Sequence, residues 1–183
     1  MGVSAPPSEP AYLVDTNVVS YFFNAGHEAE LATVGARMPL VAVEEVHREL
    51  LGDVKGNARA YKRWQAAGNL TVRPLLVGSE GASRLGRLYS RTTGRDLGEY
   101  ASIALATDDP SLVFVTNDKT GHWIGARELL GERVLRFWAF LRRAQQAAGF
   151  TAGVVQAILL NTRSNLQRDE PLWLKDWLAT LPP

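Results

Sequence analysis

Four carboxylates in this sequence stand at spacings that could build one reactive site. Asp15 and Asp118 each come at the end of a short apolar run, and Glu49 and Glu99 stand in segments whose apolar residues recur at helical spacing. Carboxylates that converge in a half-buried site repel one another and raise each other's pKa values, and a hard divalent cation removes that cost. The set therefore predicts a magnesium or manganese site with oxygen ligands.

A cation held in this way can deprotonate a bound water and stabilise the charge that develops on a phosphodiester. The expected reaction is hydrolysis of a phosphate ester without a covalent intermediate. Cysteine is absent from the chain, so thiolate metal sites and disulfides are excluded, which suits a reducing cytoplasm.

Asp15 and Asp118 also have purely structural explanations. Asp15 or Asn17 can cap the helix that follows, and Asp118 can form a turn with Asn117. The helix that carries Glu49 places His47 equally well on the opposite flank of its apolar face, so helical geometry does not choose between them.

Glu99 shares a helical face with Ile103 and Ala106, which places its carboxylate in register with apolar residues. Asp96 lies three residues earlier over the same face and is a further candidate ligand of lower rank. Asp96-Leu97-Gly98-Glu99 also matches a capping box, in which Asp96 caps the helix and Glu99 reaches back to the cap. The two roles are compatible.

The elements that must position these acids alternate between strands and helices. Short apolar runs predict strands over 12–14, 40–43, 70–77 and 111–116, and helices are expected over 44–51, 57–67, 79–91 and 96–106. Such alternation favours an α/β fold with a parallel central sheet flanked by helices in three layers. In such a sheet ligands collect at the carboxyl ends of the strands, where Asp15 and Asp118 stand.

The chain divides into three parts. Residues 1–10 contain three prolines and no apolar run and are expected to be a disordered lead-in, residues 11–140 form the α/β domain, and residues 141–183 form a helical extension without strands. A helix is expected over 151–167 and another after Pro171, which carries Trp173 and Trp177. These two tryptophans either pack on the main domain, which we favour, or bind a partner.

The 183 residues carry 20 basic and 19 acidic side chains, so the net charge of +1 gives no case for nucleic-acid binding. The sequence contains no run of 18 apolar residues, so no membrane-spanning helix is expected. A local basic stripe exists, because Arg84, Arg87 and Arg91 share a helical face and Arg95 follows. It could track RNA phosphates into the acidic site, or it could be a solvated face that supports ion pairs.

His122 and Trp123 follow Asp118 closely and have two interpretations. They could stack on a base, or they could pack on the edge of the sheet, which we favour.

The ordered acidic motifs resemble those of PIN-domain nucleases, and the VapC-like toxins of bacterial toxin–antitoxin modules are the nearest group. The resemblance spans about residues 11–130 and rests on Tyr12-Leu13-Val14-Asp15-Thr16-Asn17, Glu49-Leu50-Leu51-Gly52, Leu97-Gly98-Glu99 with Ile103-Ala104-Leu105-Ala106, and Val115-Thr116-Asn117-Asp118. It implies a PIN fold, a magnesium or manganese site at the four acids, and endonucleolytic cleavage of RNA. It also implies that Thr16 and Asn17, or Thr116, orient the ligands through hydrogen bonds.

The same resemblance adds a protein antitoxin and a second copy of the chain as expected partners, and a cytoplasmic location. Two features depart from it: many PIN proteins have Asp where Glu99 stands, and the segment after Leu141 has no counterpart in the compact toxins. The alternative function is a non-catalytic PIN-like module that binds RNA or protein. A dinucleotide-binding fold is excluded, because Asp15-Thr16-Asn17 is no glycine-rich turn.

Overall fold

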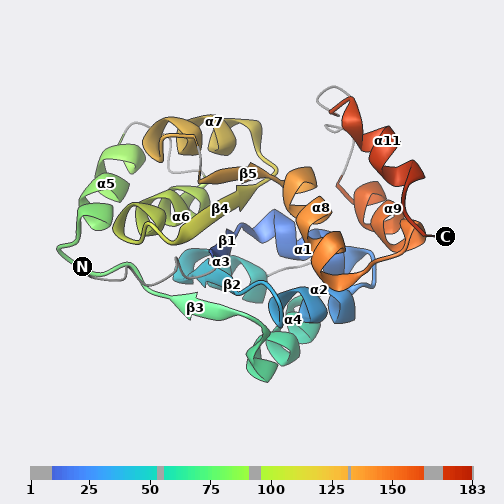
Figure 1. Ribbon diagram of the computed structural model, residues 1–183. Coiled ribbons are helices and arrows are strands. Elements are labelled where there is room, and N and C mark those ends of the chain that lie inside the picture. The colour runs from blue at the N-terminus through green and yellow to red at the C-terminus, as the bar shows by residue number, and fades with distance from the viewer. Residues whose placement is uncertain (1–9, 53–55, 91–95, 132, 163–170, 183) are drawn as a thin grey trace, which may run out of the picture.

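The centre of the molecule is a five-stranded parallel sheet with the strand order β3-β2-β1-β4-β5 (Figure 1). The computed structural model describes residues 10–52, 56–90, 96–131, 133–162 and 171–182. The strands are β1 (Ala11–Val14), β2 (Leu40–Val43), β3 (Thr71–Arg73), β4 (Leu112–Thr116) and β5 (Val134–Arg136). The predicted α/β class with a helix-flanked parallel sheet is confirmed.

Helices cover both faces of the sheet. On one face lie α1 (Thr16–Asn24), α2 (Glu28–Gly35) and α8 (Phe137–Ala148); on the other lie α6 (Leu97–Asp108) and α7 (Lys119–Glu128), with α5 (Glu80–Tyr89) packed on α6. The side chains of each strand alternate between these faces. The ring of Tyr12 meets Phe140 of α8 at 5.6 Å, whereas Phe114 lies against Gly125 of α7.

The remaining elements join or extend these layers. The connection from β2 to β3 contains α3 (Glu44–Leu51), α4 (Ala58–Trp64) and the π-helical turn η1 (Gln65–Asn69). The expected helix over 57–67, closed by Gly68, is therefore α4 followed by this π-helical turn, in which Gly68 adopts φ of 84°. Beyond α8 the chain forms α9 (Ala152–Leu160) and α11 (Trp173–Ala179).

The strand order reverses between β1 and β4. From β1 the chain builds β2 and β3 on one side, and it then crosses the sheet to add β4 and β5 on the other. The strands β1 and β4 are in register, with Val14 opposite Val115, so both end at the same level. A crevice at the carboxyl ends of two such strands is the usual ligand site of open α/β sheets.

The C-terminal helices share the core of the domain. The helix α8 runs across residue 140, and its Phe137, Phe140 and Leu141 are fully buried. Farther along, α9 packs on α1, and Leu174 and Trp177 of α11 are buried in the same apolar cluster. Trp177 is thus buried, whereas Trp173 is only partly buried.

Several boundaries differ from the prediction. The strand expected over 70–77 ends at Arg73, because Pro74 has no N–H to donate to a neighbouring strand. The helix expected over 151–167 ends at Leu160, and the residues 163–170 lie outside the described part of the chain, as does the lead-in except Pro10. The elements α7 and β5 were not predicted. Within the described residues, no helix combines the length and the apolar character that crossing a membrane requires.

Two leucine-sized side chains of α9 test whether the extension belongs to the core. Ile158 is fully buried and Leu160 is 83% exposed. We expect Ile158→Ala to lower the free energy of unfolding by about 2–5 kcal/mol. Leu160→Ala, the control in the same helix, should change it by less than about 0.5 kcal/mol.

Urea unfolding followed by circular dichroism and by tryptophan fluorescence measures both variants. Because one core includes α9, the two signals should shift together in the Ile158→Ala protein. A separate early transition confined to one signal would show instead that α9 folds independently of the sheet.

Candidate metal centre

Asp15 lies at the carboxyl end of β1, where it serves both as a helix cap and as a buried acid. Its Oδ1 accepts a hydrogen bond from the Thr16 N–H at 2.7 Å, and its Oδ2 accepts one from Asn17 Nδ2 at 3.4 Å. The residue is only 3% exposed. Burial, together with the negative charge of Glu49, raises the pKa of Asp15 to about 6.

Glu99 lies in the first turn of α6 and faces Asp15 across Thr116. The Thr116 hydroxyl donates to Glu99 Oε1 at 3.0 Å and lies 3.4 Å from Asp15 Oδ2. Burial, and then the charges of Asp15 and Asp118, raise the pKa of Glu99 to about 8. Both acids thus bind protons more tightly than exposed carboxyls do, chiefly because burial penalises their charged forms.

Asp118 lies between β4 and α7 and is the N-cap residue of α7. Its Oδ1 accepts from the Gly121 N–H at 2.7 Å, as a helix cap does, and its own N–H donates to Thr116 Oγ1 at 3.0 Å. The Thr116 hydroxyl therefore contacts three of the four predicted acids or their backbone. The capping and the site interpretations of Asp15 and Asp118 are both compatible with this geometry.

Glu49 joins the cluster from α3, and His47 does not. The Thr16 hydroxyl donates to Glu49 Oε2, and Thr16 also holds Asp15 through its N–H. His47 turns to the other flank of the helix, where its Nδ1 lies 2.7 Å from the Tyr61 hydroxyl. Contacts with Thr16 and Tyr61 thus determine that Glu49, and not His47, lies in the cluster.

Asp96 precedes α6 in a left-handed backbone conformation, with φ of 64°. Its side chain makes no capping hydrogen bond, and the Glu99 carboxylate contacts Thr116. The predicted capping box is therefore wrong. Asp96 is exposed, and its charge is a minor cause of the raised pKa of Glu99, which places it on the border of the cluster.

Two glycines make room for these carboxylates. A Cβ on Gly121 would lie 2.2 Å from Glu99 Oε1, and a Cβ on Gly98 would lie 2.8 Å from Glu49 Oε1. Neither glycine has a positive φ, so what each contributes is space: a larger residue there would displace the neighbouring carboxylate. The role of Gly121 was not predicted, although its place three residues after a capping acid was a usable signal.

The donor set is chemically suited to a hard cation. All of its ligand atoms are carboxylate oxygens, which hard cations prefer. Two of the carboxylates, Asp15 and Glu99, are buried close together with raised pKa values. A bound cation would remove the free-energy cost of ionising them there. As the side chains stand, no three Asp, Glu or His residues of the described chain are close enough to enclose a metal ion. The carboxylates must therefore shift toward a cation in order to bind it together.

The predicted arginine stripe is only partly described. Arg84 pairs with Glu80 of its own helix at 3.3 Å and with Glu128 of α7, so its charge already has acidic partners. Arg87 is exposed, while Arg91 and Arg95 lie outside the described residues. Arg84 thus fits the ion-pair interpretation of the stripe.

The raised pKa values predict how stability depends on pH when no metal is present. A group whose pKa is higher in the folded state stabilises that state fully only below its unfolded value, near 4, and the contribution is lost as the pH rises through the folded value. With folded values of about 6 for Asp15 and about 8 for Glu99, the free energy of unfolding should fall as the pH rises from about 5 to 8.

The Glu99→Gln protein should lose the upper part of this dependence, because glutamine does not ionise. Urea unfolding in chelator at a series of pH values measures both proteins. Equal slopes between about pH 6.5 and 8 would contradict the assignment of that window to Glu99.

The space beside Glu99 can be tested with a matched pair of glycine substitutions. Gly121→Ala should displace the Glu99 carboxylate and weaken Mn²⁺ binding at least about tenfold in titration calorimetry. Gly86→Ala in α5 is the control, because a Cβ there meets nothing within 4 Å. Equal Mn²⁺ affinity in the two variants would show that Glu99 is not a ligand.

Comparison with known proteins leaves the chain without assigned relatives. It matches no protein-family model, no curated protein and no solved structure.

Proposed function

We propose that this chain is a metal-dependent endoribonuclease of the PIN type, which hydrolyses RNA phosphodiesters at Asp15, Glu49, Glu99 and Asp118. The observation that carries the proposal is the contact of two buried carboxylates, Asp15 and Glu99, with the single hydroxyl of Thr116. Burying two such groups costs stability, and a fold without a cationic ligand would have little use for the arrangement.

In this proposal Asp15, Glu99 and Asp118 would hold Mg²⁺ or Mn²⁺, with Glu49 completing the set from α3 and Asp96 as an outer candidate. The bound cation would supply an activated water and stabilise the charge of the phosphodiester under attack. Thr116 and Asn17 orient the carboxylates through hydrogen bonds, as the resemblance implies. Thr16 holds Asp15 through its N–H and Glu49 through its hydroxyl, so it fixes the spacing between them.

The proposal extends to partners. RNA is the substrate, and the resemblance to VapC-like toxins adds a protein antitoxin and a second copy of the chain. We place the activity in the cytoplasm, where its RNA substrate is found and where a chain without cysteine loses nothing to a reducing environment.

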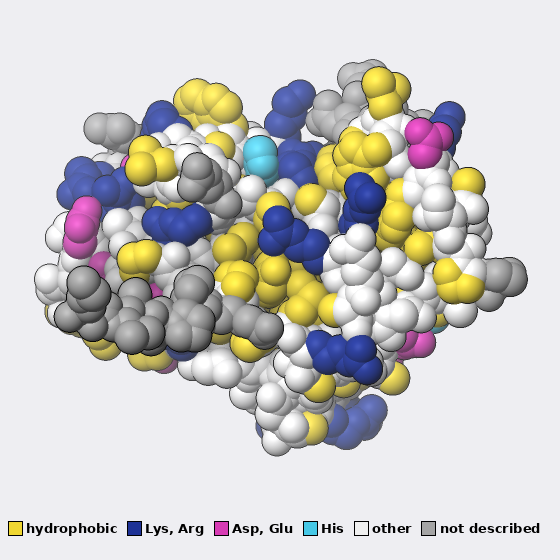
Figure 2. All heavy atoms as spheres, in the orientation of Figure 1, with side chains coloured by type: hydrophobic (Ala, Val, Ile, Leu, Met, Phe, Trp, Pro, Cys, Tyr) yellow, Lys and Arg dark blue, Asp and Glu magenta, His cyan; other side chains and the backbone are white. Residues whose placement is uncertain are grey.

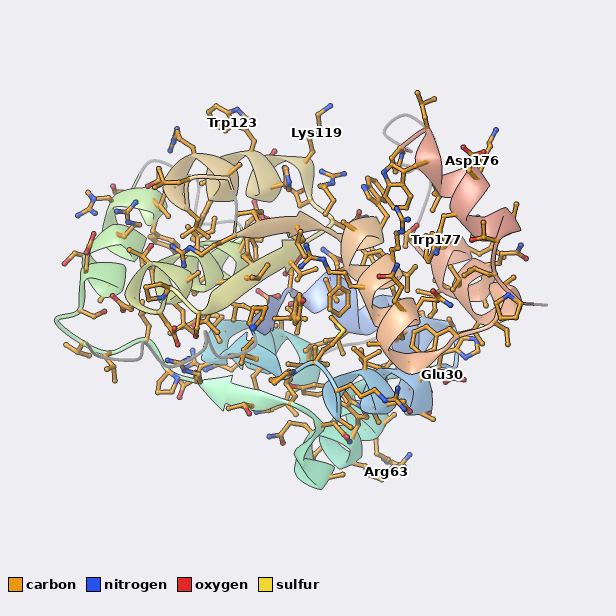
Figure 3. The ribbon with its side chains drawn as sticks, viewed as in Figure 1. Glu30, Arg63, Lys119, Trp123, Asp176 and Trp177 are labelled. Carbon is orange, nitrogen blue, oxygen red and sulfur yellow. The ribbon has the colours of Figure 1, made fainter. Side chains whose placement is uncertain are left out.

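The test uses purified protein and RNA with Mg²⁺ or Mn²⁺, and then with chelator. Cleavage should require the metal, and Asp15→Asn combined with Asp118→Asn should reduce it more than about 100-fold, because each change keeps the side-chain shape and removes one negative charge. Asp176→Asn on α11 is the control, since this exposed acid lies far from Lys119 at the start of α7 (Figure 3).

Cleavage that survives chelation or the double substitution would contradict the proposal. RNA binding without any metal-dependent cleavage, in a protein that also fails to bind Mn²⁺, would favour the non-catalytic PIN-like module instead.

A further inference from the structure

A large aromatic side chain is exposed one turn beyond the acidic cluster. Trp123 of α7 is 62% exposed, so the expectation that it packs on the sheet edge is wrong. The buried face of α7 consists of Gly121, Ile124 and Gly125, and Trp123 points the other way. Exposing an indole costs stability and is typical of a recognition surface.

Cationic side chains accompany this indole along the same helical face. Lys119, Trp123 and Arg127 are spaced four residues apart, and the Arg127 guanidinium lies 5.1 Å from the centre of the Trp123 ring. Figure 3 shows Lys119 and Trp123 projecting from α7 on the side away from the sheet. In Figure 2 dark blue and yellow side chains gather on this upper edge.

A further cation, Arg136, lies at the end of β5, one strand away from the cluster. In the sheet, Arg136 of β5 lies opposite Thr116 of β4. Two residues earlier in these strands, Val134 lies opposite Phe114, and both side chains face Gly125 of α7. Because side chains alternate along a strand, Thr116 and Arg136 face the same side of the sheet.

Arg136 is held in place without an acidic partner. Its guanidinium stacks on Trp138 at 4.8 Å, and its charge contributes, after burial, to the lowered pKa of His122 on α7. Among the described residues no carboxylate forms an ion pair with it. Its positive charge is therefore available one strand away from the acidic cluster, where it could bind a phosphate of a strand that enters the cluster.

We propose that Arg136, Lys119 and Trp123 form a track that binds single-stranded RNA and leads it to the acidic cluster. The two cations bind phosphates and the indole stacks on a base. A duplex keeps its bases stacked inside the helix, whereas an unpaired strand can offer them to an exposed ring. This inference rests on the proposed function in one respect, namely that the cluster acts on RNA, and it adds the residues that bind the strand outside the cluster.

The experiment measures binding in chelator, so that cleavage does not enter. A fluorescein-labelled 12-nucleotide oligouridylate, alone or paired with oligoadenylate, is titrated with the full chain and followed by fluorescence anisotropy. The single strand should bind more tightly than the duplex. Trp123→Ala should weaken single-strand binding about tenfold or more, while Trp123→Phe should restore most of it.

Arg136→Gln should weaken binding and reduce the slope of log affinity against log salt by about 0.7, the value for one phosphate contact on a single strand. Two matched controls should bind as wild type does. Arg142→Gln removes an arginine that also stacks on a tryptophan, Trp173 at 5.2 Å, and Leu172→Ala removes an apolar side chain that is 96% exposed.

Absence of single-strand binding, equal affinity for the duplex, or unchanged binding in Trp123→Ala would each overturn the proposal. Failure of this proposal can be distinguished from failure of the proposed function. A chain that binds through Trp123 but never cleaves contradicts only the nuclease assignment, and a chain that cleaves RNA while ignoring Trp123 and Arg136 contradicts only the track.

Discussion

Two carboxylates, Asp15 and Glu99, lie buried against the hydroxyl of Thr116 at the point where the sheet reverses its strand order. The loss of hydration of these two groups, and then the negative charges near them, raise their pKa values and oppose folding with both groups ionised. The surrounding apolar core must therefore be large enough to tolerate them. The close packing of helices on both faces of the sheet meets that requirement, with the C-terminal helices adding buried side chains.

Hydrogen bonds from backbone N–H groups hold Asp15 and Asp118 in position. Asp15 and Asp118 each cap the helix that follows their strand, and in Asp15 one carboxylate oxygen makes the cap while the other faces Asn17 and Thr116. These caps keep Asp15 and Asp118 at the same edge of the sheet, and their carboxylates still have to shift in order to bind one cation together. Gly98 and Gly121 keep open the space into which Glu49 and Glu99 extend.

Much of this arrangement could be predicted from the sequence, because strong local patterns carry it. The apolar runs before Asp15 and Asp118 predicted the strands, and parallel topology then placed both acids at one edge. The helix over residues 44–51 was predicted at its observed bounds. Whether Glu49 or His47 faces the site depended on Thr16 and Tyr61, which are distant in sequence, so no local rule could choose.

Local sequence patterns could not predict some other features of the fold and the site. The strand β5 has three residues, too few to show alternation, and α7 contains two glycines and begins with polar residues. The exposure of Trp123 and the placement of Arg136 beside Thr116 follow from these two elements, so neither could be predicted. The capping box failed because Asp96 adopts a left-handed conformation and Glu99 finds a buried partner elsewhere.

An anomalous-difference map from crystals soaked in Mn²⁺ tests whether the acidic cluster binds a divalent cation. We expect a peak with carboxylate oxygens of Asp15, Glu99 and Asp118 around it at about 2.0–2.4 Å, a range that brackets the distances of hard divalent cations from oxygen ligands. A map with no peak at this edge of the sheet, or with Mn²⁺ held only by other acids, would contradict it.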